Sequence, residues 1–568
     1  MKTKLFLAML MLSVCGKAQL PAFEWAVGSD GSGKSVAKAV TTDSAGNIVV
    51  TGFFENTVDF NPGTEKAEFT SLGYRDIFIE KFNSNGIFLW AKQIGSKNND
   101  YGYSAVCDKD GNIYVTGTYG ATADFDPGDS TYNLTPKGWN DIYVLKLDTD
   151  GNFIWATGFD GTDREQGNAI TIDKNGDLLV TGKFEGDVDF DPDPDSLLNI
   201  HPAGRDDVFI LKLSNDADLI WVKQLGGTQI ETGNAIATDN ENNIVVTGYF
   251  EGTVDFDPDE NETKEITSLG GHDIFVVKLD SNGNLIWVKQ MGGDDHQEAN
   301  GVDIDAGNNI FIAGTFRDTA DFDPGSNVEE LIAMSEDIFI ENLDQDGNFR
   351  WVNHIGNNDW PQCFDIVCAG NGNLYITGGF QYTIDLDPGY GVYEQTSNGG
   401  YDIFVEELTS DGEFVWAGTM GGKNNYEYGF DICTDKNNNI ITAGVFNSDA
   451  DFDPGTDTII LDNKNIWGDL FVQKLNHNST ATIISDKTED NNKIIVYPNP
   501  SYGYVNVSFG GKIEDAKIEI FNISGMTVET INVSDCNSYT LNIHHGKGIY
   551  LVKVTTGNKS EVFRLLVK

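Results

Sequence analysis

The chain has 568 residues, of which 37 are basic and 88 acidic, so its formal net charge is −51. A charge of this sign and size repels phosphate backbones and anionic lipid, which argues against nucleic acid and membrane surfaces as partners. The 63 glycines and 34 phenylalanines indicate many tight turns around a packed β interior rather than disorder.

Residues 1–18 are typical of a signal peptide. Lys2 and Lys4 precede the apolar stretch 5–14, and Gly16-Lys17-Ala18 forms a small-residue end. The apolar stretch is too short to span a bilayer and no longer one follows, so we expect no transmembrane segment and an extracellular or surface-displayed monomer. Cys15 leaves lipoprotein processing open, although Val14 stands where that processing requires a small residue.

The five cysteines that remain after cleavage at residue 18 are odd in number and lack paired spacing. They therefore predict neither a disulfide framework nor a metal cluster, and small buried apolar side chains are the simpler interpretation.

One acidic turn recurs along the chain at intervals of 64 to 66 residues. Its copies follow the pattern Asp-Phe-Asp-Pro-Gly with few departures and begin at Asp59, Asp124, Asp189, Asp255, Asp321, Asp385 and Asp451. A fixed period of this length predicts an array of equivalent units rather than a set of unrelated domains.

Each unit contains two predicted hairpins. In the fourth copy, the segments 233–239 and 244–250 flank an Asn-Asn turn, and the segments 273–279 and 285–289 flank an Asn-Gly turn. Four antiparallel strands per unit, repeated seven times without helical periodicity, predict an all-β fold: a seven-bladed β-propeller over residues 19–475.

The phase of the repeats predicts how the ring closes. A tryptophan of the fourth strand recurs from Trp25 to Trp416, whereas the third strand recurs from Asp76 to a last copy at Phe471. Trp25 has no third strand before it, and Phe471 has no tryptophan strand after it. We therefore expect residues 23–27 to form the outermost strand of the last blade, which leaves no open sheet edge. The recurrent tryptophans and phenylalanines then serve packing between blades.

In such a meander the short turns emerge on one face and the long connections on the other. The connection from Glu55 to Tyr74 is too long to be structureless, so it predicts a small extra hairpin. Because long connections often carry function, the face that they form is the expected binding surface.

The acidic turn supplies two carboxylate or amide side chains to one side of an extended backbone. Hard oxygen ligands on a rigid turn could begin a calcium site, although calcium needs six to eight oxygens and the spacing of an EF-hand loop is absent. The alternative is that these side chains cap the turn while its phenylalanine anchors it in the core. The candidate calcium ligands are Asp59, Asn61, Asp124, Asp126, Asp189, Asp191, Asp255, Asp257, Asp321, Asp323, Asp385, Asp387, Asp451 and Asp453.

The pattern Ala-Ile-x-x-Asp-x-x-Gly-Asn-Ile-x-Val-Thr-Gly, present at 39–52 with Val40 in place of isoleucine, resembles the bacterial secreted β-propeller repeats called SBBP repeats, relatives of NHL propellers. The resemblance covers about residues 22–475 and implies a fold more than an activity. Some copies depart from the pattern: Ala369 replaces the turn aspartate, Ala313 and Ala443 replace the threonine, and Leu386 replaces the phenylalanine of the acidic turn.

Residues 476–493 are polar and unpatterned, which predicts a linker. Six or seven short strand segments follow within residues 494–568 and predict a small Ig-like β-sandwich. The motifs Tyr-Pro-Asn-Pro-Ser at 497–501, Gly-Ile-Tyr-Leu-Val-Lys-Val at 548–554 and a final Leu-Val-Lys resemble the type A sorting domain of the type IX secretion system. The resemblance implies passage through the outer membrane by that machinery. An ordinary Ig-like binding module is the alternative.

Three hypotheses for function remain at this stage. The first is a non-catalytic secreted or cell-surface scaffold that binds a protein or glycan through its long-loop face. The second is an extracellular polysaccharide-acting enzyme, for which Trp360, His354 and Asp359 break the repeat symmetry and would gather near the axis. The third is a calcium-stabilised structural array, with calcium as the only cofactor considered.

Overall fold

The computed structural model describes residues 21–193, 195–259, 261–356, 359–389, 391–423, 426–463, 467–477, 495–497, 504–522, 526–542, 548–556 and 559–567. The predicted signal peptide and most of the predicted linker lie outside these residues, as does the segment 498–501 of the first sorting motif. Contacts divide the chain into two compact units, with the division between Ala481 and Thr482.

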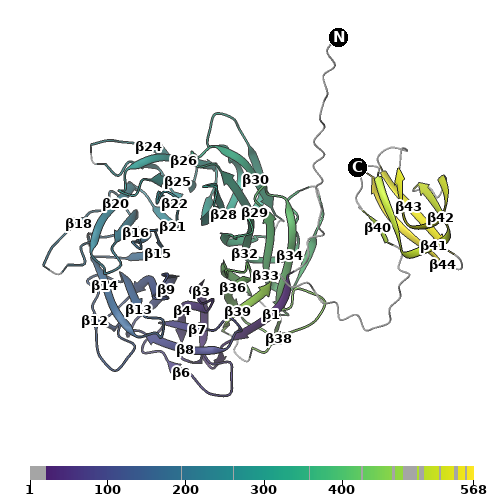
Figure 1. Ribbon diagram of the computed structural model, residues 1–568. Coiled ribbons are helices and arrows are strands. Elements are labelled where there is room, and N and C mark those ends of the chain that lie inside the picture. The colour runs from purple at the N-terminus through teal and green to yellow at the C-terminus, as the bar shows by residue number, and fades with distance from the viewer. Residues whose placement is uncertain are drawn as a thin grey trace, which may run out of the picture. The chain divides into compact units, whose positions relative to one another are not determined.

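The first unit consists of four-stranded antiparallel groups arranged around a common axis (Figure 1). The innermost, first strands are β3 (Lys34–Thr42), β9 (Asp100–Cys107), β15 (Glu165–Ile172), β21 (Glu231–Thr238), β27 (Gln297–Ile304), β31 (Gln362–Cys368) and β35 (Tyr428–Thr434). The second strands are β4 (Ile48–Glu55), β10 (Ile113–Tyr119), β16 (Leu178–Phe184), β22 (Ile244–Phe250), β28 (Ile310–Asp321), β32 (Asn373–Asp385) and β36 (Ile440–Phe446).

The third strands are β7 (Asp76–Phe82), β13 (Asp141–Leu147), β19 (Asp207–Leu213), β25 (Asp273–Leu279), β29 (Glu330–Leu343), β33 (Glu394–Thr409) and β39 (Asp469–Asn476). The fourth strands are β8 (Phe88–Ile94), β14 (Phe153–Gly161), β20 (Leu219–Gly227), β26 (Leu285–Gly293), β30 (Phe349–Ile355), β34 (Phe414–Gly422) and β1 (Ala22–Gly28). Strand β1 comes from the other end of this unit and pairs antiparallel with β39, with Phe23 opposite Leu475 and Val27 opposite Val472.

The predicted small hairpin is present in the long connections, and the acidic turn forms its tip. It consists of β5 (Thr57–Asp59) with β6 (Glu68–Thr70), β11 (Ala123–Asp124) with β12 (Asn133–Leu134), β17 (Val188–Asp189) with β18 (Asn199–Ile200), β23 (Thr253–Asp255) with β24 (Glu265–Thr267), and β37 (Ala450–Asp451) with β38 (Ile460–Leu461). The short strand β2 (Asp30–Gly31) also pairs with β5. In the fifth and sixth groups the hairpin is continuous with the long strands β28, β29, β32 and β33.

The Val-Thr-Gly pattern of the second strand has a structural cause. The buried hydroxyl of Thr247 donates to the carbonyl of Phe275 at 2.8 Å, so it needs no water. A Cβ atom on the following Gly248 would lie only 1.8 Å from the carbonyl oxygen of Thr232, at a bulge in the first strand. Only glycine fits at this close approach.

The recurrent tryptophans lie between neighbouring groups, as the repeat pattern predicts. The indole N–H of Trp90 donates to the carbonyl of Thr149 in the tight turn of the next group, and the ammonium of Lys81 donates to the same oxygen at 2.9 Å. Trp25 on β1 and Lys474 on β39 donate in the same way to the carbonyl of Ser84.

The second unit is a five-stranded antiparallel sheet of β40 (Ile495–Tyr497), β41 (Tyr504–Asn522), β42 (Thr527–Asn542), β43 (Gly548–Thr556) and β44 (Lys559–Val567). The expectation of six or seven short strands is wrong in one respect. The segments 504–509 and 516–521 are parts of one strand, β41, because the chain continues through a register shift between Ser508 and Ile513 instead of turning. Val507, Ile518 and Val552 belong to the core of this unit.

Candidate functional site

Two faces of the first unit differ in what they carry. We call the face of the short turns capped by Asp or Asn, such as 43–47 and 83–87, the tight-turn face. The face of the long connections, such as 56–75 and 95–99, is the long-loop face. On the tight-turn face the same hydrogen bonds recur in nearly every group. Asp43 Oδ1, for example, accepts the N–H groups of Ala45 and Asn47, each at 2.9 Å.

The acidic turns of the long-loop face are held by their own side chains. Asp59 Oδ1 accepts the N–H groups of Asn61 at 3.2 Å and Ala67 at 2.9 Å, and Asn61 Oδ1 accepts the N–H of Gly63 at 2.8 Å. The pattern recurs at all the other copies. The aromatic or leucine side chain between the two acids is buried at every copy, as at Phe60 and Leu386. The hydrogen bonds and the burial are those expected of a capped and anchored turn.

The structure brings the candidate calcium ligands together two at a time, one pair per turn. Among the residues that the structure describes, no group of three or more His, Cys, Asp or Glu side chains is placed to hold a metal ion. Calcium at these turns therefore stays a prediction that needs further oxygens.

Three glutamates lie beneath acidic turns and were not singled out from the sequence. Glu80, Glu341 and Glu406 are at most 1% exposed, and none of their carboxylate oxygens has a hydrogen-bond partner in the described part of the chain. Burial raises the pKa of each well above its usual value. In the last group Gln473 stands at this position and donates to the carbonyl of Phe452 in the acidic turn. A protonated glutamate has the same shape as glutamine and can make the same hydrogen bond.

A second set of buried acids lies between neighbouring groups, where each third strand begins. Glu231 Oε2 accepts the N–H of Gly227 at 3.1 Å, but Oε1 has no partner among the described residues. Gln297 occupies the same place in the next group, and its amide both accepts from Gly293 and donates to the carbonyl of Arg317. Burial, followed by repulsion from Asp207, raises the pKa of Glu231 to about 8. Near pH 7 the Glu231 carboxyl is therefore mostly protonated and neutral, like the amide of Gln297.

Burial also raises the pKa of Glu165 to about 8 and that of Glu427 to about 7 at two other boundaries. Perturbed carboxyl groups usually indicate a functional site, but these glutamates occupy equivalent positions around the axis instead of converging in one sector. They belong to the framework.

His354 also has a framework role. Its Nε2 lies 2.8 Å from Asp337 Oδ2, where Gln93 and Gln290 of other groups donate to the corresponding aspartates. Trp360 behaves differently: its side chain is 44% exposed, and the guanidinium of Arg317 lies 4.5 Å from its ring. The neighbouring Asp359 accepts a hydrogen bond at its backbone carbonyl from Gln381.

Residues at the inner end of the long-loop face differ from group to group, although the framework around them repeats. Trp360 stands where other groups have Arg164, His296 and Tyr426, and Tyr401 stands where they have Arg75, Asn140, Asp206, His272 and Glu336. The hydroxyl of Tyr401 donates to the carbonyl of Trp360 at 3.0 Å. Sequence reasoning missed most of this set because it searched for residues that recur. Variation at a fixed repeat position is the signal that could have found them.

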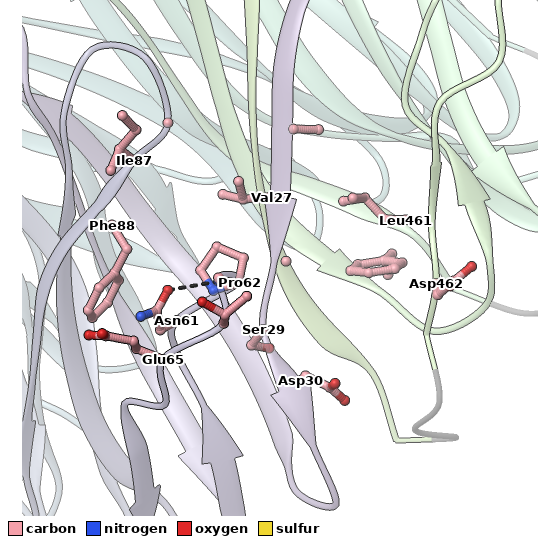
Figure 2. A pocket seen from close by; sticks show the side chains of 16 residues that line it. Val27, Ser29, Asp30, Asn61, Pro62, Glu65, Ile87, Phe88, Leu461 and Asp462 are labelled. Carbon is pink, nitrogen blue, oxygen red and sulfur yellow. Dashed lines mark hydrogen bonds between the residues drawn. The ribbon is translucent and has the colours of Figure 1, made fainter.

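Two hollows lie away from the inner strands. One lies between β1 and the first acidic turn, where Val27, Pro62, Ile87 and Leu461 form its wall, and Asn61 is engaged with Gly63 (Figure 2). The other lies at the fourth acidic turn and includes Lys223 among its lining residues.

Comparison with known proteins agrees with this architecture. Residues 495–568 match the family model of a secretion system C-terminal sorting domain, and residues 89–118 and 220–249 match a β-propeller repeat model. The chain is 26% identical over 347 residues to the uncharacterized WD repeat-containing protein L264 of Acanthamoeba polyphaga mimivirus, a match that covers 52% of this chain and 25% of that protein.

It is also 22% identical over 256 residues to the regulatory protein FlaEY of Caulobacter vibrioides, covering 43% of this chain and 26% of that protein. The chain thus spans about a quarter of the length of these relatives. A solved fungal alcohol oxidase of the AA5 family, in complex with copper, matches with a TM-score of 0.37 and 11% identity over 97% of this chain and 100% of that one. This likeness is too weak to indicate a fold or an activity.

The class is therefore an all-β repeat protein of the β-propeller kind. More particularly, the chain is a β-propeller repeat protein with a C-terminal type IX sorting domain, which indicates export to the cell surface or the extracellular space. Within the described residues no helix has the length and hydrophobicity of a membrane span.

Glu231→Gln tests whether the framework glutamates are neutral. The folded protein holds a proton on Glu231 up to about pH 8, whereas the unfolded chain releases it near the ordinary pKa of 4.5. The free energy of unfolding of the native protein therefore falls as pH rises through this window. We expect the free energy of unfolding of the variant to fall by about 1 kcal/mol less per pH unit than that of the native protein. Urea unfolding at about pH 5 and about pH 8 measures this difference. Gln297→Glu should make the free energy of unfolding fall more steeply with pH than in the native protein. If the difference between Glu231→Gln and the native protein did not change with pH, Glu231 would not be protonated as assigned.

Proposed function

We propose that the first unit is a closed seven-bladed β-propeller and that β1 completes its last blade. The pairing of β1 with β39 supports this, as does the shared use of the Ser84 carbonyl by Trp25 and Lys474. One apolar cluster joins Val40 and Phe78 of the first group to Leu470 of the last. The domain limits that we propose are residues 1–18 for the signal peptide, 19–475 for the propeller, 476–493 for the linker and 494–568 for an Ig-like sorting β-sandwich.

We propose further that the propeller is a non-catalytic binding scaffold, secreted or held at the cell surface, whose long-loop face takes a protein or glycan ligand. One observation carries this proposal: the inner end of that face varies between groups, while the rest of each group repeats. Residues that the fold does not need, and that are partly exposed, are available for recognition. The framework role of the perturbed carboxyls and of His354 favours binding over the alternative of a polysaccharide-acting enzyme.

A binding panel tests the scaffold function. The purified mature protein is screened against glycans and extracellular proteins, with Trp360→Ala on the long-loop face and Lys109→Ala, at the exposed tip of a tight turn, as the matched control. We expect Trp360→Ala to weaken ligand binding roughly tenfold and Lys109→Ala to leave it unchanged, as for a hot-spot aromatic against a neutral site. Conversion of a glycan to product, or a larger effect of Lys109→Ala, would refute the proposal.

Deletion of residues 494–568 tests the sorting function separately. The two compact units have separate cores, so the propeller should still fold while losing the signal for the outer membrane. We expect the truncated protein to accumulate in the periplasm with the melting temperature of the propeller unchanged. Normal appearance of the truncated protein in the medium would show that the C-terminal domain does not direct export.

A calcium-stabilised array is a second candidate, because a buried glutamate could complete three of the acidic turns. Glu341 lies close enough to Asp321 and Asp323 for their charges to raise its pKa, and Glu406 stands in the same relation to Asp385 and Asp387. If calcium binds there, a hundredfold excess over Kd should stabilise the protein by about 2.7 kcal/mol. Chelation should then lower the melting temperature, and Glu341→Gln should reduce that effect. If chelation left the melting temperature unchanged, the acidic turns would not bind a stabilising metal ion.

A further inference from the structure

A row of aromatic side chains runs from Tyr401 on β33, the third strand of the sixth group, to Phe430 on β35, the first strand of the seventh. The rings of Tyr401 and Tyr426 have centroids 6.1 Å apart, those of Tyr426 and Tyr428 6.4 Å, and those of Tyr428 and Phe430 5.8 Å. Within these three pairs the ring planes are inclined by at most 27°. Tyr426 is 56% exposed, so the row begins in solvent and continues inward. We call these four residues the aromatic row.

The framework does not require an aromatic residue at the position of Phe430. On the opposite side of the axis, Asn168, Asn234 and Asn300 stand where Phe430 stands on β35, and each donates its amide N–H to a carbonyl of the next first strand, at 2.9 to 3.0 Å. This amide ladder is a sufficient way to join neighbouring strands. The aromatic row replaces it on one side only, which breaks the symmetry of the ring.

Three cations lie beside the aromatic row, around Phe430 and around Phe53, which packs in one cluster with Tyr428 and Phe430. The ammonium of Lys38 lies 3.6 Å from the ring centroid of Phe430. Lys34 and Arg75 both lie over the ring of Phe53, with their charged groups 5.8 Å and 4.7 Å from its centroid. We call Lys34, Lys38 and Arg75 the cation cluster.

The cation cluster has too little negative charge around it. Arg75 is paired with Glu55 at 2.8 Å, but neither Lys34 nor Lys38 forms an ion pair within the described part of the chain. Burial, followed by repulsion from Lys34 and Arg75, lowers the pKa of Lys38 to about 8. In a chain with a net charge of −51, three mutually repelling cations beside aromatic rings are the arrangement that a bound anion would stabilise.

We propose that the aromatic row and the cation cluster form one binding site for an acidic glycan. The acid group of the glycan, a uronate carboxylate or a sulfate, lies against Lys38, Lys34 and Arg75, whose N–H groups donate to its oxygens. The sugar rings lie along Tyr426 and Tyr428, which offer apolar ring surface together with hydroxyl groups. This inference rests on the proposed binding function and names the class of ligand for it.

A glycan fits these features better than an acidic peptide. Sugar units joined in a chain present an apolar C–H surface at regular intervals, which matches near-parallel rings in a row. The cations beside the rings fix the position of the acid group, because ammonium and guanidinium groups bind carboxylate and sulfate through charge-assisted hydrogen bonds.

Titration calorimetry with three probes on the full mature protein tests the site. The probes are an oligogalacturonate, its neutral methyl ester and a sulfated galactan oligosaccharide. We expect at least one acidic probe to bind and the methyl ester to bind roughly tenfold more weakly or not at all, with affinity that falls as salt is added. The two acidic probes separate a carboxylate site from a sulfate site.

Two variants locate the binding. Lys38→Met removes an unpaired cation. It should weaken binding of the acidic probe roughly tenfold or more, because hydrogen bonds to charged groups are the strong ones. Lys183→Met is the matched control: it also removes one positive charge from an inner position, but Lys183 is paired with Asp206 on the other side of the axis. It should change the affinity less than twofold. Tyr426→Ala, at an exposed position, should weaken the binding of the acidic probe and any residual binding of the methyl ester.

Equal effects of Lys38→Met and Lys183→Met, or no binding of either acidic probe, would overturn this site. The broader proposal would survive that result if a neutral glycan or a protein bound in a manner sensitive to Trp360→Ala. A melting temperature of Lys38→Met at or above that of the native protein would show that weaker binding does not arise from misfolding.

Discussion

The fold depends on one shared hydrogen-bond acceptor between neighbouring groups. A fourth-strand indole N–H and a third-strand ammonium meet at a single carbonyl oxygen in the tight turn of the next group, as Trp90 and Lys81 do at Thr149. The glycine of that turn adopts a positive φ, and a side chain there would collide with the indole; at Gly151 a Cβ atom would lie 3.1 Å from Trp90. Glycine is therefore favoured in this turn, although Ala217 adopts the same positive φ in the turn that Trp155 contacts. Because both donors belong to one group and the acceptor to the next, this contact fixes how the groups are inclined to each other.

The two faces of the first unit therefore have different roles. The tight-turn face carries the tryptophan and lysine contacts together with buried ion pairs such as Lys278 with Asp239 at 2.8 Å. Most of its residues therefore recur, with Asn342 and Glu407 in place of the lysine and Ala369 in place of the aspartate as exceptions. The long-loop face is joined by acids such as Glu231, for which glutamine is an adequate substitute at Gln297. The framework does not depend on the residues at its inner positions, so these residues can differ between groups without loss of the fold. Specificity can therefore develop on one face while stability resides on the other.

Much of the framework could be predicted from the sequence because its causes are local and recur. The Val-Thr-Gly strand, the capped acidic turn and the small hairpin each follow from residues close together in the chain, and the structure contains all three. The strand pairing of residues 23–27 followed from the phase of the repeats alone. The continuous strand β41 was missed because a register shift within a strand and a turn between two strands have similar sequence signals.

The candidate site could not be predicted in the same way, because its charges become neighbours only in three dimensions. Lys38, Arg75 and Phe430 lie far apart in the chain, on segments that come together only when the protein folds. Each is ordinary when considered alone, and a chain with so many acids gives every lysine an apparent partner. What distinguishes Lys38 is that the fold places it against an aromatic ring and two other cations. A repeat fold can thus gather the few cations of an acidic protein in one place, where an anionic ligand can add negative charge to that of Glu55.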